Sequence, residues 1–363
     1  MTSWASRLPD IKLSLSLSDG SLGLLLLAPP AGQLAAMALS GCLVKRFGSF
    51  RIVRVAGLIL PCWLPVLGMI SAWPGLFAAL FFFGMATNLS NISINTQCIG
   101  IEQIYGKSIM ASFHGVWSLG GIGAILLSSC CAIRGLSPKT NFLFAAAVSV
   151  FIYLMNFRNL LPCDRQTEQQ KKTVNFKELL SNKYLWILGI ISLGCLGCEG
   201  VMNNWSSIYF QKIVNAELQY VRVGLFVYML FLTCNRFTAD WFIRKWGGEN
   251  MIRLSGVLII CGMALLTSSP YVLPAAAGCA LVGMGTSVIV PICYGLVGKY
   301  DSVPTATAIT MVAGVGFIGF LVMPALVGGL SEWIGLKTAL FLVGCFSFLT
   351  TWMIVFTRKK TSN

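Results

Sequence analysis

Runs of about 20 apolar residues, separated by short polar breaks, recur along almost the whole chain. A run of this length forms a helix that can cross the hydrocarbon core of a bilayer, where backbone groups must be satisfied within the segment. The pattern therefore predicts an all-α polytopic membrane protein with about 11 transmembrane helices. The predicted spans are residues 20–44, 51–71, 74–100, 108–132, 140–160, 183–209, 220–243, 251–269, 272–297, 305–330 and 336–357.

The amino-acid composition supports a membrane protein and affects how the positive net charge is interpreted. Hydrophobic residues make up 56% of the chain and charged residues 10%, whereas soluble domains have about 25% charged residues. The net charge of +14 would suggest a nucleic-acid partner in a soluble protein. Here the Lys and Arg residues gather in alternate loops, which is the positive-inside pattern. We therefore expect a lipid bilayer and no nucleic acid around the chain, with the C-terminal tail in the cytoplasm.

The sequence also contains an internal repeat at an offset near 199 residues. The loop KRFGSFRIVRVAG at 45–57 matches RKWGGENMIRLSG at 244–256. Two halves of the same order are typical of a large class of secondary transporters. The repeat predicts an N-terminal bundle at 1–160, a linker at 161–182 with a short amphipathic helix, and a C-terminal six-helix bundle at 183–363. Matching positions include Gly48 with Gly247, Gly84 with Gly283 and Gly120 with Gly319.

The repeat leaves one helix without a full counterpart. The span at 183–209 corresponds only to residues 1–7 in the first half, where Ser3-Trp4-Ala5-Ser6 matches Asn204-Trp205-Ser206-Ser207. We expect that the first helix of the first half is missing from this sequence, through a late start site or a shortened gene. The expected total is therefore 12 helices minus the first.

Two stretches carry a family resemblance: SWASRLPDIKLSLSLSDGSLGLLLLAPPAG at Ser3–Gly32 and MASFHGVWSLGGIGA at Met110–Ala124. They resemble the fucose-permease-like branch of the major facilitator superfamily. The resemblance implies two pseudo-symmetric helical bundles in a bacterial inner membrane, with a central cavity lined by the first, fourth, seventh and tenth helices. Residues 77–100, 183–209 and 272–297 would then line that cavity.

The helix at 183–209 carries Glu199 near the middle of an apolar span. A carboxylate costs a few kcal/mol there, so an intramembrane carboxyl is a functional hypothesis by default. Glu199 is the main candidate for proton coupling; a permanently protonated group that bonds a neighbouring helix is the alternative. Asn203 lies one turn on and shares its face, and Asn203 and Asn204 are candidates for binding a polar substrate.

Asn88, Asn91 and Asn95 form a polar stripe at spacings of three and four residues. Amides on one face suit a hydroxylated solute, although hydrogen bonds between helices are the plainer explanation. The further candidates are Gln97 and Trp117 for substrate and His114, the only histidine, for proton handling.

Two charged groups of residues are candidates for gating. Arg236 and Asp240, four residues apart near the predicted cytoplasmic end of their helix, are expected to pair with each other or with the basic loop. The other group resembles a loop of the superfamily that holds the inward gate, but Lys45 stands where that pattern usually has Asp. Its members are Gly41, Lys45, Arg46, Gly48 and Arg51.

Together these features favour a proton-coupled secondary transporter of a small, sugar-like polar solute that works as a monomer by alternating access. Efflux of a drug-like or metabolic compound remains an alternative, as does a truncated protein that cannot transport. No nucleophile–base set, phosphate loop or metal-ligand cluster is visible in the sequence, so we expect neither an enzyme nor a cofactor. Cys195 and Cys198 form a C-x-x-C within a span, where small packing residues are the simpler interpretation.

Overall fold

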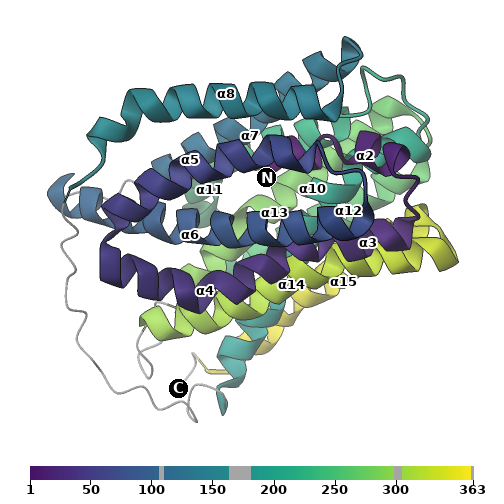
Figure 1. Ribbon diagram of the computed structural model, residues 1–363. Coiled ribbons are helices and arrows are strands. Elements are labelled where there is room, and N and C mark those ends of the chain that lie inside the picture. The colour runs from purple at the N-terminus through teal and green to yellow at the C-terminus, as the bar shows by residue number, and fades with distance from the viewer. Residues whose placement is uncertain (106–109, 163–180, 298–304, 361–363) are drawn as a thin grey trace. The chain divides into compact units, whose positions relative to one another are not determined.

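The computed structural model describes residues 1–105, 110–162, 181–297 and 305–360. The described part is helical and contains no strand (Figure 1). The predicted amphipathic helix of the linker lies outside the described residues. Internal contacts divide the chain into two compact units: unit 1 comprises Met1–Leu17 and Leu24–Gln169, and unit 2 comprises Ser18–Gly23 and Gln170–Asn363.

The first half of the chain forms short helices followed by five long ones. Pro138 is in the first turn of its helix, where proline is well tolerated, and the preceding Ser137 hydroxyl accepts a hydrogen bond from Thr140 N at 3.3 Å. The elements are α1 (Thr2–Ala5), α2 (Leu8–Ser14), α3 (Asp19–Leu26), α4 (Ala28–Phe47), α5 (Ser49–Leu67), α6 (Trp73–Tyr105), α7 (Met110–Ile133), α8 (Pro138–Asn156) and the 3₁₀ turn η1 (Phe157–Asn159).

The second half begins with its most buried membrane-crossing helix, whose N-terminus is capped by the Asn182 side chain, 3.0 Å from Tyr184 N. The elements are α10 (Lys183–Lys212), α11 (Val223–Trp246), α12 (Gly248–Ser268), α13 (Val272–Val297), α14 (Thr305–Ile334), α15 (Leu336–Trp352) and the 3₁₀ segment η2 (Met353–Lys360).

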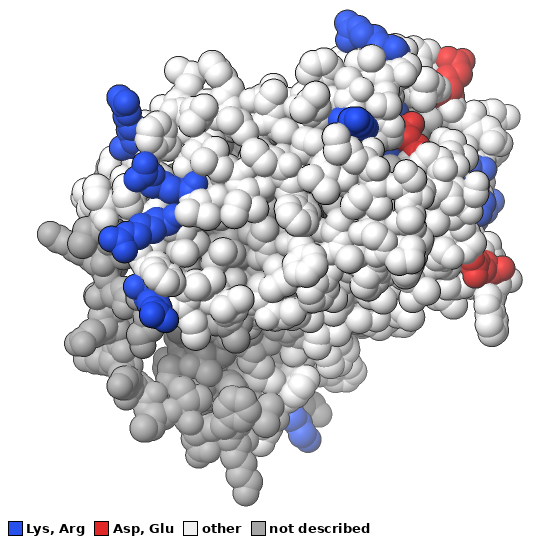
Figure 2. Space-filling model, viewed as in Figure 1, with Lys and Arg blue, Asp and Glu red and all other residues white. Residues whose placement is uncertain are grey.

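Ten helical stretches in the described part are long and apolar enough to cross a membrane. The helix α11 adds a shorter apolar stretch, Val223–Ala239. Figure 2 shows the same pattern on the visible surface, where charged side chains are few and a broad area carries none. The sequence-based prediction of an all-α polytopic membrane protein is confirmed.

Backbone geometry repeats within the chain as the sequence pattern does. Gly48, between α4 and α5, has φ 80° and ψ 149°, and Gly247, between α11 and α12, has φ 78° and ψ 150°. All positive-φ residues in the described ranges fall into such pairs, 199 or 200 residues apart: Gly48 with Gly247, Gly135 with Gly335, and Ser16 with Asn215. The two halves therefore turn the chain at equivalent places.

These turns make one prediction for stability. The φ and ψ of Gly247 lie in a region open essentially only to glycine, so Gly247→Ala is expected to lower the free energy of unfolding by about 1–3 kcal/mol. A Cβ at Gly247 would meet nothing within 4 Å, so the cost comes from the backbone alone. Thermal unfolding of the purified protein in detergent measures it. Gly295→Ala in α13, also in open space, is the matched control, and an equal melting temperature for the two variants would contradict the assignment.

In unit 2, α10 is the central helix and packs against α14, α15, α13 and α11. Leu188, Ile191 and Trp205 are fully buried, and the Trp205 indole nitrogen donates to the Pro324 carbonyl oxygen at 2.9 Å. Small residues permit the closest approach: a Cβ at Gly319 would overlap the carbonyl oxygen of Leu193. The side chains of the middle of α10 are therefore held in a tight setting.

The short segment Ser18–Gly23 is fixed to unit 2 by polar contacts. The Asp19 carboxylate lies 2.6 Å from Lys212 Nζ and accepts a hydrogen bond from Ser331 Oγ at 2.8 Å. Gly20 N donates to the Glu332 carboxylate at 2.8 Å. These contacts join the start of α3 to the C-terminal ends of α10 and α14.

Candidate functional site

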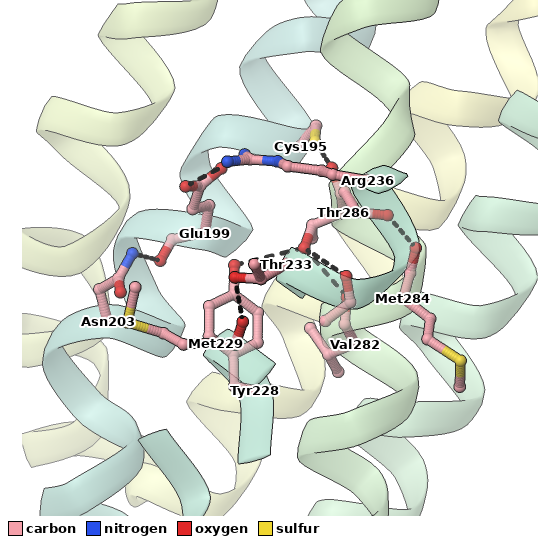
Figure 3. A network of polar contacts seen from close by, with 12 residues as sticks. Cys195, Glu199, Asn203, Tyr228, Met229, Thr233, Arg236, Val282, Met284 and Thr286 are labelled. Carbon is pink, nitrogen blue, oxygen red and sulfur yellow. Dashed lines mark hydrogen bonds and ion pairs between the residues drawn. The ribbon is translucent and has the colours of Figure 1, made fainter. Parts of the chain in front are cut away.

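The candidate site is an ion pair between two helices of unit 2. Glu199 lies in the middle of α10, and its carboxylate is 3.9 Å from the guanidinium of Arg236 in α11. The two side chains are 15% and 33% exposed, so neither ionic group is fully covered by the described residues. Figure 3 shows the charged ends facing each other across the two helices. At 3.9 Å the pair is ionic without a direct hydrogen bond.

Arg236 lies in the second half of α11. The helix α11 continues to Trp246, ten residues beyond Arg236, which corresponds to about 15 Å of helix. The sequence analysis placed Arg236 near the helix end and paired it with Asp240, whose side chain lies outside the described residues. The signal that it overlooked is that Glu199 and Arg236 are opposite charges on two helices of the same half.

A network of hydrogen bonds holds the helices around this pair (Figure 3). Asn235, next to Arg236, donates to the Met284 carbonyl oxygen at 2.9 Å and to Ser287 Oγ at 2.7 Å in α13. The Thr286 hydroxyl lies 3.3 Å from the Tyr228 hydroxyl of α11. These bonds tie α11 to α13 and fix the stretch of helix that carries Arg236.

The α10 side of the site is ordered by its own turns and by α13. The Cys195 thiol donates to the Thr286 carbonyl oxygen at 3.3 Å. Asn203 donates to the backbone oxygen of Glu199 at 2.9 Å, and Asn204 to that of Gly200 at 2.7 Å. One hydrogen of each amide is thus used within the helix, and neither amide bonds the Glu199 carboxyl in the described contacts.

The asparagine stripe of α6 belongs to unit 1. Asn88 and Asn95 are partly buried and Asn91 is exposed. The Asn88 side-chain oxygen is buried and has no hydrogen-bond partner among the described residues, which is costly unless water or a solute supplies one. Asn88 is therefore the member of the stripe with the strongest structural reason to bind a ligand.

Gln97 has a different setting from the rest of that stripe. Its side chain is buried, its amide nitrogen lies 2.5 Å from Ser49 Oγ and 3.2 Å from the Leu161 carbonyl oxygen, and its oxygen accepts from Leu161 N at 2.8 Å. Because the amide joins α6 to the start of α5 and to the chain after η1, this geometry favours a structural role for Gln97.

The remaining candidates are spread over unit 1. Trp117 in α7 is 60% exposed. Arg46 and Arg51 are exposed beside the Gly48 turn, with the Arg46 guanidinium 5.4 Å from the Phe47 ring centre. These residues belong to unit 1, whereas Glu199 belongs to unit 2. The side chains of His114 and Lys45, and the surroundings of Gly41, lie outside the described residues.

The described ranges contain no cluster of side chains that could serve as a metal site. No group of three or more His, Cys, Asp or Glu residues there could hold an ion. Cys195 and Cys198 are both buried within α10, as a packing role requires.

Comparison with known proteins agrees with the fold and the repeat. Residues 3–304 match the family model described as Major Facilitator Superfamily. An uncharacterised MFS-type transporter of Yersinia pestis is 26% identical over 99% of this chain and 92% of its own length. Membrane protein MosC of Rhizobium meliloti is 27% identical over 100% of this chain and 88% of its own.

Solved structures show the same fold at low sequence identity. The match to the crystal structure of the nucleoside transporter NupG covers 99% of this chain and 95% of the NupG chain, with a TM-score of 0.80 and 17% identity. A bacterial homologue of the human lysosomal transporter Spinster, inward-facing and occupied, covers 98% of this chain and 92% of its own, with a TM-score of 0.77 and 11% identity. The family model spans most of the chain, and its fold is the one that the repeat and the helices build: the chain belongs to the major facilitator superfamily.

Proposed function

We propose that this protein is a secondary active transporter that moves a small, hydroxylated polar solute with protons by alternating access. The observation that carries the proposal is the Glu199–Arg236 pair, because two opposite charges inside membrane-crossing helices are costly and are retained for use. In this proposal Glu199 is the residue that carries the proton, and the change in its charge is felt by the neighbouring Arg236.

Amide groups support a polar solute. Asn88 offers a buried oxygen without a described partner, and Asn203 and Asn204 retain amide oxygens as acceptors beyond the hydrogen bonds that their nitrogens make. Sugars and polyols present hydroxyl groups that donate to such oxygens. In this proposal the protein is a monomer of the fucose-permease-like branch, in a bacterial inner membrane, with its C-terminal tail in the cytoplasm as the positive-inside pattern favours.

Proton flux into proteoliposomes that enclose a pH-sensitive dye tests the function. The probes are D-galactose, D-xylose, myo-inositol and D-gluconate, added outside at acidic pH with the membrane potential clamped. We expect at least one probe to acidify the lumen faster than in empty liposomes. No acidification with any probe would contradict the proposal and favour the transport-incompetent alternative, whereas proton release coupled to the exit of an aromatic dye would favour efflux.

A further inference from the structure

Within the described residues, the N–H donors of the Arg236 guanidinium are not all used in hydrogen bonds. A guanidinium has five N–H donors in a planar fork that matches a carboxylate in two-point contact. The Glu199 oxygen at 3.9 Å is its ion-pair partner in the described residues and is beyond hydrogen-bond distance. Arg236 is one-third exposed, so the described residues leave part of the guanidinium uncovered.

The helix segment that carries Arg236 is hydrogen-bonded to α13, while the ion pair itself is long, at 3.9 Å. The neighbouring Asn235 is bonded twice to α13, at 2.9 Å and 2.7 Å, so α11 cannot easily turn to satisfy the guanidinium elsewhere. Glu199 is equally fixed, on the buried central helix α10. A second carboxylate could approach the guanidinium more closely than the resident one does, without moving either helix.

The groups around Glu199 leave the charge balance to Arg236. Tyr228 of α11 and Cys195 and Cys198 of α10 lie within electrostatic range of the Glu199 carboxylate, and Cys293 of α13 lies near Cys195. The helices α14 and α15 contain one ionic residue each, Glu332 and Lys337, and Glu332 bonds the Ser18–Gly23 segment instead. Arg236 is therefore the cation that compensates Glu199 among the described residues.

We propose that Arg236 binds the carboxylate of an anionic, hydroxylated substrate in place of Glu199, and that Glu199 takes up one proton in the exchange. This inference rests on the proposed function and names its substrate class. Before binding, the carboxylate of Glu199 and the guanidinium of Arg236 sum to zero charge. After binding, protonated Glu199 is neutral and the substrate carboxylate balances Arg236, so one proton and one anion enter together. The site stays electroneutral, which avoids an uncompensated charge inside the membrane.

Matched pairs of acids and alcohols test the site by binding alone, without a gradient. The probes are D-gluconate with D-sorbitol, D-galacturonate with D-galactose, and L-lactate with propane-1,2-diol, added to purified protein in detergent. Thermal stability is followed against probe concentration. We expect at least one acid to bind more tightly than its alcohol, with an affinity that rises as the pH falls, by at most about tenfold per pH unit because one proton is taken up.

Two variants assign the preference to the pair. Arg236→Gln is expected to weaken acid binding about 10- to 100-fold and to leave alcohol binding unchanged, as for a lost charge-assisted contact. Arg244→Gln, which removes an exposed guanidinium from the same helix, is the control. If Arg236→Gln does not fold, Glu199→Gln decides the matter, because it is expected to bind the acid at least as tightly as the wild type and without the pH dependence.

The inference is overturned if no acid exceeds its alcohol, if Arg236→Gln keeps the preference, or if Glu199→Gln keeps the pH dependence. It fails separately from the proposed function. Proton flux with a neutral solute, together with no preference for acids, would retain the transporter and remove the anion site. A preference for acids without any proton flux would retain the anion site and remove the coupled transport.

Discussion

Glu199→Gln is expected to abolish accumulation of substrate against its gradient while leaving exchange of substrate across the membrane intact. In a one-proton symport with the potential clamped, a gradient of one pH unit can raise the internal concentration about tenfold, because one pH unit corresponds to about 1.4 kcal/mol. A glutamine cannot carry the proton, so the accumulation ratio should fall from about 10 to about 1. Exchange between labelled and unlabelled substrate needs no net proton movement and should persist.

Uptake of the labelled probe that passes the proton-flux test measures both quantities in one preparation. Glu217→Gln is the matched control, because Glu217 is an exposed carboxylate beyond the end of α10. This variant should accumulate substrate like the wild type. Accumulation that survives Glu199→Gln would place proton coupling elsewhere. Loss of exchange as well would show that Glu199 is needed for the conformational change that carries substrate across the membrane. It would contradict the assignment of Glu199 to proton coupling alone.

The repeat was the part of the fold that the sequence specified best. Glycine at 48 and 247 was visible as a match in the sequence, and the structure explains the match by a φ near +80° that only glycine adopts easily. Apolar runs specified the helices for a similar reason, since their length is set by the bilayer. Both signals are local: each can be read from a short window and needs no knowledge of neighbouring helices.

The site was harder to predict because its contacts join helices that are distant in sequence. Spacing along α11 favoured Asp240 or the basic loop as the partner of Arg236, and it gave no sign of Glu199, which the structure brings to Arg236 from another helix. In the same way Gln97 lies on the helix of the asparagine stripe, but its partners Ser49 and Leu161 come from elsewhere in the chain. A helical spacing predicts which residues share a face, and tertiary packing decides what that face meets.

Gly84→Ala and Gly283→Ala are expected to reduce the amount of folded protein strongly, by the same mechanism in each half. A Cβ at Gly84 in α6 would overlap the carbonyl oxygen of Pro29 in α4. A Cβ at Gly283 in α13 would overlap that of Tyr228 in α11. Both the glycines and the carbonyl residues correspond at an offset of 199, so this close helix approach is one repeated contact. The obstructing atoms are backbone, which no side-chain rotation can relieve.

The helices would therefore have to separate, at a cost of about 2–3 kcal/mol in overpacking, together with the loss of van der Waals contacts that hold helices together in membranes. Size-exclusion profiles and melting temperatures of the two variants in detergent measure the effect. Gly314→Ala in α14, where a Cβ meets nothing within 4 Å, is the control and should behave like the wild type. A loss of stability in only one of the two variants would show that the two halves do not share the mechanism. Equal losses in both variants would support one helix crossing that is used twice. In unit 2 that crossing joins α11 to α13, and α11 carries Arg236, so the same contact helps to set the position of the guanidinium.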